Sequence, residues 1–276
     1  MSSIRWVKRD LKINFLRVRN IATFLSITLI SLSLFFIIYQ NLNFGIDFKG
    51  GTLIEIKKSS EKSLSDIRGD LSSLNLGDIQ IQTFGSDDNI LIRIENLASN
   101  QGNANLTPSK LITEKLGSGF EIQRTEIVGP KVSSELIQKG LLAIIIAVFL
   151  MLFYIWIRFE WQFSIGAVAA LIHDIIITIG IFSFLKIEFN LSIIAALLTI
   201  IGYSMNDTVV VYDRIRENLR KYKQMELFDL INKSLNETMS RTLLTSVTTL
   251  IALFSLYFLG GEVLKGFTFA MILGVF

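Results

Sequence analysis

Two adjacent polar residues, Asn206 and Asp207, interrupt an apolar run over residues 191–212. If that run crosses a membrane, an ionisable side chain there costs about 2.5 to 3.5 kcal/mol and should face other helices or a wet cavity. Thr199, Tyr203 and either Asn206 or Asp207 fall at helical spacing and give the predicted helix a polar stripe. The stripe favours a functional carboxylate. The alternative is that the helix ends near Tyr203 and Asp207 only caps it.

Arg241 precedes a further apolar run, residues 242–259, and Thr245, Thr248 and Thr249 follow on the same helical face. Such an arginine, taken alone, is typical of a snorkelling residue at the membrane surface. Beside a buried carboxylate on the preceding run, it becomes a candidate counter-ion for Asp207. A guanidinium favours the ionised carboxylate and desolvation disfavours it, so a change in their separation would couple conformation to proton occupancy.

His173 and Asp174 lie near the middle of another apolar run, residues 163–185. Histidine titrates near neutral pH, so this pair could extend a proton relay. A structural hydrogen-bonded pair that fixes the helix against its neighbours explains the two residues equally well. The candidate relay comprises Asp207, Arg241, Asn206, Asp174, His173 and Thr245. With one histidine and no cysteine, the sequence predicts no metal site.

The composition indicates a membrane protein, since 51 % of the residues are hydrophobic and 18 % are charged. Five apolar runs are long enough to cross about 30 Å of hydrocarbon: residues 21–39, 141–157, 163–185, 191–212 and 242–259. The last apolar run, residues 267–276, covers only about half a bilayer. We expect a sixth span cut short by the end of the chain. A re-entrant or interfacial segment is the alternative.

Basic residues set the expected orientation. They gather in residues 1–20 and again in residues 213–241, which we expect to form a cytoplasmic loop. Four predicted spans separate these two segments, so both can be cytoplasmic. Residues 40–138 then lie on the outer side. Residues 21–39 are long for a signal peptide, and no small-residue cleavage site follows them.

Residues 40–138 have the composition of a soluble domain and the pattern β-α-β-β-α-β. The predicted elements are a strand at 52–58, a helix at 63–76, strands at 78–84 and 90–96, a helix at 107–117 and a strand at 120–128, with a turn at 85–89. This order predicts a ferredoxin-like sandwich of one sheet and two helices. The domain has no histidine and no nucleophile with a plausible base, which favours a binding or moving domain over an enzyme.

Several motifs along the chain resemble, in order and over nearly its whole length, those of the SecF family, one half of the bacterial SecDF protein-export factor. They are "FGIDFKGGT" (44–52), "VGPKVSSEL" (128–136), "WIRFEWQFSIGAVAALIHD" (156–174), "LLTIIGYSMNDTVVVYDRIREN" (197–218), "SRTLLTSVTTL" (240–250) and "GGEVLKGF" (260–267). The resemblance implies an α-helical polytopic membrane protein. Its architecture would be a six-span half of a resistance-nodulation-division bundle, with the sixth span truncated, and an inserted α+β ferredoxin-like periplasmic domain.

The resemblance also implies a function. The chain would be an accessory subunit that works with SecD beside the SecYEG channel, and with YajC. It would use the proton-motive force to drive late stages of preprotein translocation across the bacterial inner membrane. Such a subunit hydrolyses nothing, uses no cofactor besides protons, and touches preprotein and lipid but no nucleic acid.

By the same resemblance, Asp207 matches the proton-carrying carboxylate of the family and Arg241 its functional arginine. The segment where the first span meets the outer domain would contain a hinge, with motif residues Gly45, Asp47, Gly50 and Gly51. Gly129 and Pro130 match the return connection to the second span.

Two other classes share some of these features. A stand-alone proton-coupled exporter of small molecules or lipids would have the same relay and topology, but such exporters usually fuse two halves and two large outer domains. An intramembrane aspartyl protease would also place two aspartates on neighbouring spans. Neither Asp174 nor Asp207 has the glycine context that those active sites use.

Overall fold

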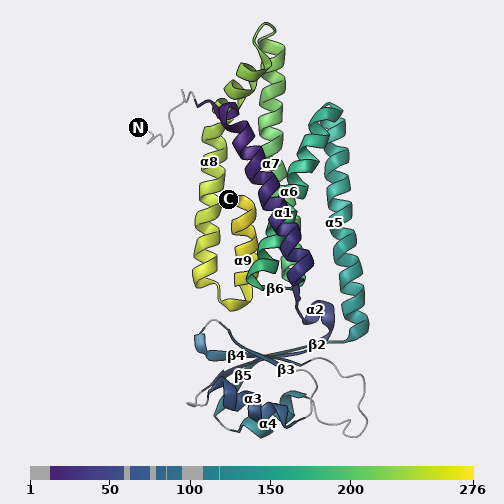
Figure 1. The fold of residues 1–276 in the computed structure, drawn as a ribbon, viewed down its shortest axis with the longest axis vertical. Helices are drawn as coiled ribbons and strands as arrows, with labels where there is room; N and C mark the ends of the chain where they lie inside the picture. Colours follow the sequence, from purple (N-terminus) through teal and green to yellow (C-terminus); the bar gives the residue numbers. More distant parts are fainter. Residues whose placement is uncertain (1–12, 59–62, 75–78, 85, 95–107, 118) are drawn as a thin grey trace. The chain divides into compact units, whose positions relative to one another are not determined.

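The computed structural model describes residues 13–58, 63–74, 79–84, 86–94, 108–117 and 119–276 (Figure 1). The chain forms two compact units. The helical unit comprises Met1–Asn43, Leu142–Ile187 and Ser192–Phe276, and the sheet unit comprises Phe44–Leu141 together with Glu188–Leu191. The predicted outer domain, residues 40–138, did not include this last four-residue segment. The basic residues before Ile13 lie outside the described residues.

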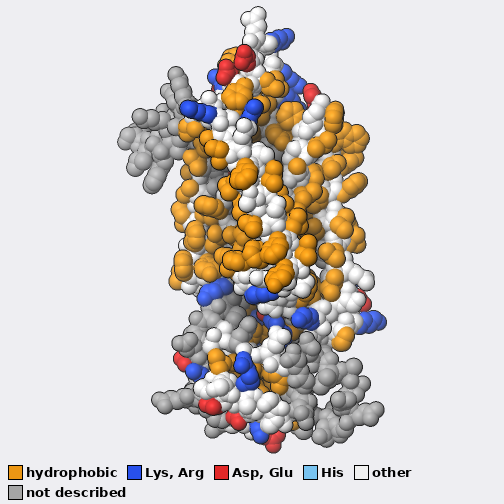
Figure 2. Space-filling view, in the orientation of Figure 1, with side chains coloured by type: hydrophobic (Ala, Val, Ile, Leu, Met, Phe, Trp, Pro, Cys, Tyr) orange, Lys and Arg blue, Asp and Glu red, His pale blue; other side chains and the backbone are white. Residues whose placement is uncertain are grey.

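The part of the chain that the structure describes has five helices long and apolar enough to cross a membrane. They are α1 (Arg19–Gln40), α5 (Pro130–Arg158), α6 (Trp161–Leu185), α7 (Leu191–Lys221) and α8 (Leu227–Leu259). Each contains one of the five predicted apolar runs, which are thereby confirmed as helices. Hydrophobic side chains occupy much of the visible face of these helices (Figure 2), and only 6 % of the apolar window of α1 or of α8 is buried. Surfaces of this kind suit lipid or partner helices.

Three of these helices extend beyond the predicted spans. Helix α5 begins at Pro130, α7 continues to Lys221, and α8 begins at Leu227. The predicted loop, residues 213–241, is therefore helical except at residues 222–226. The charged and polar side chains of this segment pair between the two helices, in addition to the burial of Ile215 and Leu230. Arg214 Nε donates to Glu237 Oε2 at 2.7 Å, and Asn218 Nδ2 donates to Ser234 Oγ at 2.9 Å.

The last helix, α9 (Glu262–Val275), starts five residues before the predicted run. Its side chains at Thr268 and Ala270 are fully buried. Its glycines allow close contact with α7: a Cβ added at Gly274 would lie 2.5 Å from Cγ1 of Ile200. Helix α9 therefore packs against other helices of the helical unit, while its assignment as a sixth span stays a prediction.

The sheet unit has the predicted order β-α-β-β-α-β. Its elements are β2 (Gly51–Lys58), α3 (Leu64–Ser72), β3 (Ile79–Phe84), β4 (Ser86–Ile94), α4 (Pro108–Leu116) and β5 (Phe120–Val128). The sheet order is β3-β4-β2-β5, with all neighbours antiparallel. Strand β4 begins at Ser86, so most of the predicted turn at 85–89 is strand. Residues 75–78 and 95–107, where several predicted elements end or begin, lie outside the described residues.

The two faces of this sheet differ in chemistry because successive side chains point to opposite sides. Helices α3 and α4 lie on one face (Figure 1) and enclose an apolar core. Its fully buried members include Ile54, Ile56, Ile67, Leu71, Ile92 and Ile112. The other face carries Leu53, Leu91 and Arg93, with Ile46 of the short helix α2 (Ile46–Lys49) packed on the two leucines. Helix α2 and the two-residue strands β1 (Asn43–Phe44) and β6 (Glu188–Phe189), which pair with each other, were not predicted.

The apolar core predicts the effect of a cavity. Ile92→Ala should lower the free energy of unfolding of the sheet unit by about 2 to 5 kcal/mol. The Ile92 side chain is fully buried, so its removal leaves a cavity that the neighbouring side chains fill only in part. Ile127→Ala is the matched control, since Ile127 is 58 % exposed. Urea unfolding of the purified chain, followed by pulse proteolysis of the sheet unit, measures both. Equal losses in the two variants would contradict the described core.

Candidate functional site

A hydrogen-bonded polar cluster joins the middle of α6 to α7. The Nδ1 atom of His173 lies 2.9 Å from Oδ1 of Asp174, and Ser204 Oγ donates to Asp174 Oδ2 at 2.8 Å. Both carboxylate oxygens of Asp174 therefore have a partner. The sequence analysis missed Ser204. Ser204 lies three residues before Asp207 and therefore on the same helical face, and this spacing could have identified it from the sequence.

Two further polar atoms, one on α6 and one on α7, are buried and have no hydrogen-bond partner among the described residues. They are Nε2 of His173 and the hydroxyl oxygen of Tyr203. A ring nitrogen and a hydroxyl can each donate or accept, so these atoms can bind water or pass a proton. Ser204 precedes Asp207 by one turn of α7, about 4.5 Å along the axis. The arrangement can thus extend a proton path from Asp174 towards Asp207.

Asp207 lies near the middle of α7, which continues to Lys221. The alternative in which the helix ends near Tyr203 and Asp207 caps it is therefore wrong. Within the described part of the chain, the Asp207 carboxylate has no hydrogen bond, and it forms no ion pair with Arg241 within 4.0 Å. Arg241 is nevertheless the charged group that acts electrostatically on Asp207. The two groups interact through space and are not locked together.

The remaining relay candidates contribute less. Asn206 is exposed on α7 and has no side-chain hydrogen bond among the described residues. The Thr245 hydroxyl donates to the carbonyls of Arg241 and Thr242 in its own helix, at 3.2 and 2.9 Å. Neither side chain joins the Asp174 cluster, and their roles in a relay stay predictions.

The predicted hinge glycines have two different physical reasons for being glycine. Gly50 and Gly51 have φ angles of 76° and 135°, which L side chains rarely adopt. Gly45 has an ordinary extended backbone, but a Cβ there would overlap the Glu188 carboxylate. Backbone conformation therefore explains glycine at positions 50 and 51, and lack of space explains it at position 45, while the hinge itself stays a prediction.

The other motif residues connect this segment to two helices. Asp47 Oδ2 accepts the backbone N–H of Leu191, the first residue of α7, at 2.8 Å. Pro130 is the first residue of α5, where a missing N–H costs nothing, and Gly129 precedes it with open space around its Cα. Ser133 Oγ lies 3.3 Å from the carbonyl oxygens of both Ile46 and Gly129.

Arg93 and Glu188 form a buried ion pair that the sequence analysis missed. Arg93 Nη2 lies 2.6 Å from Glu188 Oε2, and the two side chains are 6 % and 20 % exposed. Arg93 Nη1 also donates to Gln80 Oε1 at 3.3 Å. Burial raises the pKa of Glu188 above its ordinary value, and the Arg93 guanidinium opposes this only in part. The signal was an arginine inside the apolar strand sequence "ILIRI".

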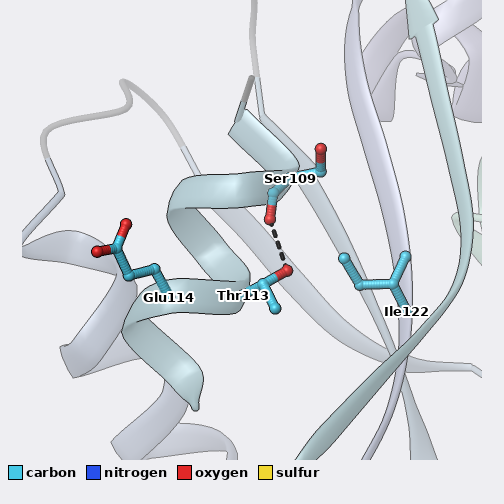
Figure 3. Close-up of a pocket in the computed structure, with 4 residues that line it drawn as sticks. All are labelled: Ser109, Thr113, Glu114 and Ile122. Atoms are coloured by element: carbon cyan, nitrogen blue, oxygen red, sulfur yellow. Dashed lines mark hydrogen bonds between the residues drawn. The ribbon is translucent and has the colours of Figure 1, made fainter. Parts of the chain in front are cut away.

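The described part of the sheet unit contains a pocket lined by residues of α4 and β5. The pocket has a volume of about 380 Å³ and is lined by Ser109, Thr113, Glu114 and Ile122 (Figure 3). The Thr113 hydroxyl donates to the Ser109 carbonyl at 2.8 Å, and Glu114 points away from the other three side chains. In the described ranges, no group of three histidine, aspartate or glutamate residues could hold a metal ion.

The Asp174 cluster predicts the effect of removing its serine. Ser204→Ala should lower the free energy of unfolding by about 0.6 kcal/mol, the average for a hydrogen bond between membrane-spanning helices. In a chain that already carries Asp174→Ala, the same substitution should leave the free energy of unfolding unchanged, because the hydrogen bond is already absent. Ser255→Ala is the control, because the Ser255 hydroxyl bonds only to its own helix, at Ile251 O. Thermal unfolding in detergent measures the four variants. If Ser204→Ala lowers the free energy of unfolding equally with and without Asp174, the hydrogen bond between Ser204 and Asp174 does not exist.

Known relatives match nearly the whole length of the chain. Among curated proteins, "Protein translocase subunit SecF" of Desulfurispirillum indicum is 44 % identical over 270 residues, covering 95 % of this chain and 86 % of the relative. The protein of the same description from Vibrio alginolyticus is 43 % identical over 273 residues, covering 98 % and 86 %.

Solved structures agree with these relatives. The crystal structure of SecDF, a translocon-associated membrane protein from Thermus, is 31 % identical with a TM-score of 0.87. The match covers 98 % of this chain and 37 % of that longer chain. The family model described as "Protein export membrane protein SecD/SecF, C-terminal" matches residues 109–276, and "SecD/SecF GG Motif" matches residues 42–57. The chain therefore belongs to the SecD/SecF family of protein-export membrane proteins.

Proposed function

We propose that this chain is an accessory subunit of the Sec protein-export machinery that, together with SecD, uses the proton-motive force to drive late stages of preprotein translocation. Its family and the descriptions of its relatives support a role in protein export. The solved SecDF chain is longer and is covered to 37 % by this one, which supports SecD as the partner that supplies the remainder.

The observation that carries the coupling mechanism is the place of Asp207. This carboxylate lies in the middle of the uninterrupted helix α7 and within its apolar part, without a hydrogen bond from any described residue, and in the field of Arg241. When the guanidinium is distant, the acid binds a proton, and when it approaches, the acid releases one. Each proton crossing 100 mV releases about 2.3 kcal/mol, enough to shift a conformational equilibrium more than tenfold.

The same proposal places the chain in the bacterial inner membrane with its N-terminus in the cytoplasm and the sheet unit in the periplasm. Basic residues at the end of α7, including Arg214, Arg216, Arg220 and Lys221, support a cytoplasmic end there. The sheet unit would meet the emerging preprotein. The SecYEG channel and YajC would be further partners, protons the only coupling ion, and ATP hydrolysis the task of a separate motor.

The first functional prediction concerns Asp207. Asp207→Asn should abolish the gradient-dependent part of late preprotein translocation while leaving expression and SecD binding intact, because an amide cannot take up and release the proton. Inverted membrane vesicles with and without a proton gradient measure this. Asp229→Asn, the same change at an exposed site on α8, is the control and should respond like the wild type. A normal gradient response in Asp207→Asn would refute the mechanism.

Arg241 gives a second prediction. Arg241→Met keeps an unbranched apolar side chain of similar length but removes the charge that acts on Asp207, so most of the gradient-dependent translocation should be lost. Arg220→Met, at the exposed end of α7, is the matched control. Mapping of the α7–α8 turn with an introduced cysteine is direct, since the chain contains none. A variant that only changes topology would mean that Arg241 is a snorkelling residue.

A further inference from the structure

Helix α7 begins inside the sheet unit. The segment Glu188–Leu191 lies between α6 and α7, yet it belongs to the compact unit formed by Phe44–Leu141. Leu191 is the first residue of α7, and from Ser192 onward the helix belongs to the helical unit. The contacts of this short segment therefore determine how the start of α7 is held.

One contact reaches the segment from the glycine motif. The Asp47 carboxylate on α2 accepts the Leu191 backbone N–H at 2.8 Å. The first N–H groups of a helix have no partner within the helix, and a negative charge is favoured at that end. Asp47, which lies 144 residues earlier in the chain, thus satisfies the start of α7.

A second contact comes from the middle of the sheet. Strand β4 places Arg93 opposite Leu53 of β2 and Gln80 of β3, so its backbone is held on both sides. Its guanidinium pairs with Glu188 at 2.6 Å. Removing one partner of a buried ion pair leaves an uncompensated charge and is strongly destabilising. The pair therefore resists partial loosening.

Backbone and aromatic contacts complete the attachment. The Gly45 N–H donates to the Phe189 carbonyl at 2.9 Å, and the ring of Phe48 lies 5.9 Å from that of Phe189. Only a glycine at position 45 leaves room for the Glu188 carboxylate in its present place.

We propose that Asp47, Arg93 and Glu188 form a latch that fixes the first turn of α7, the helix that carries Asp207, to the sheet unit. Asp207 follows Leu191 by sixteen residues, about 24 Å of continuous helix. A movement of α7 driven at Asp207 would reach the sheet unit through this latch. The attachment itself is independent of the proposed function, whereas its use in coupling rests on it.

Asp47 provides a sharp test because two substitutions separate its charge from its hydrogen bond. Asp47→Asn keeps a side-chain oxygen that can accept the Leu191 N–H, and Asp47→Ala does not. Amide hydrogen exchange of the full chain in detergent, read by mass spectrometry over residues 188–195, should become about fivefold faster in Asp47→Ala and stay near the wild type in Asp47→Asn.

Glu188 tests the other half of the latch. Glu188→Gln keeps the size of the side chain but removes its charge, and should speed exchange over the same residues by about tenfold. Glu121→Gln, at an exposed position of β5, is the matched control and should leave this exchange unchanged. If exchange over residues 188–195 is unchanged in both Asp47→Ala and Glu188→Gln, no latch exists.

Translocation into inverted vesicles tests the role in coupling. The Asp47→Ala variant should lose most of the gradient-dependent preprotein translocation, and the Asp47→Asn variant should retain it. Faster exchange with normal gradient-dependent translocation would make the latch purely structural and overturn its role in coupling. If Asp207→Asn also translocates normally, the proposed function has failed, while the exchange data still decide whether the latch exists.

Discussion

Polar groups among apolar side chains need partners inside the protein, because hydrocarbon offers none. The helical unit meets this constraint in two ways. Hydroxyl groups return to the backbone of their own helix, as at Thr199, Thr208, Thr245 and Thr248. The Asp174 carboxylate is shared between His173 and Ser204. Asp207 is different, since no described residue satisfies its carboxylate directly. An acid left open in this way is suited to exchanging protons.

The same constraint acts where α7 starts. Its first N–H would lack a partner at the junction, and Asp47 supplies one. Arg93 is nearly buried in the sheet, and Glu188 supplies its counter-charge. Both partners come from outside the element that needs them. The glycine at position 45 is explained by this arrangement, because a larger residue would displace the Glu188 carboxylate.

Periodicity and composition predicted most of the fold. The five apolar runs and the β-α-β-β-α-β order needed only local patterns, and both are present in the structure. The helical ends of α7 and α8 were missed because this part of the sequence is rich in charged residues, which pair between the two helices as Arg214 does with Glu237. The Arg93–Glu188 pair was missed because 95 residues separate its members, and no local pattern specifies such a partner. Likewise, sequence alone suggested Arg241 as a counter-ion for Asp207 but not that the two would stay apart.

Helix α7 is restrained on both sides of Asp207. Its start is held by Asp47, and its end is tied to α8 through Arg214 and Asn218, which both donate to Glu237 Oε2 at 2.7 and 2.8 Å. Glu237 precedes Arg241 by one turn of α8. A sliding of α8 along α7 would break these charged hydrogen bonds, whereas bending or rotation between the fixed points would not. The separation of Asp207 and Arg241 therefore changes most easily by distortion of the helices near these two residues, and not by sliding of α8 along α7.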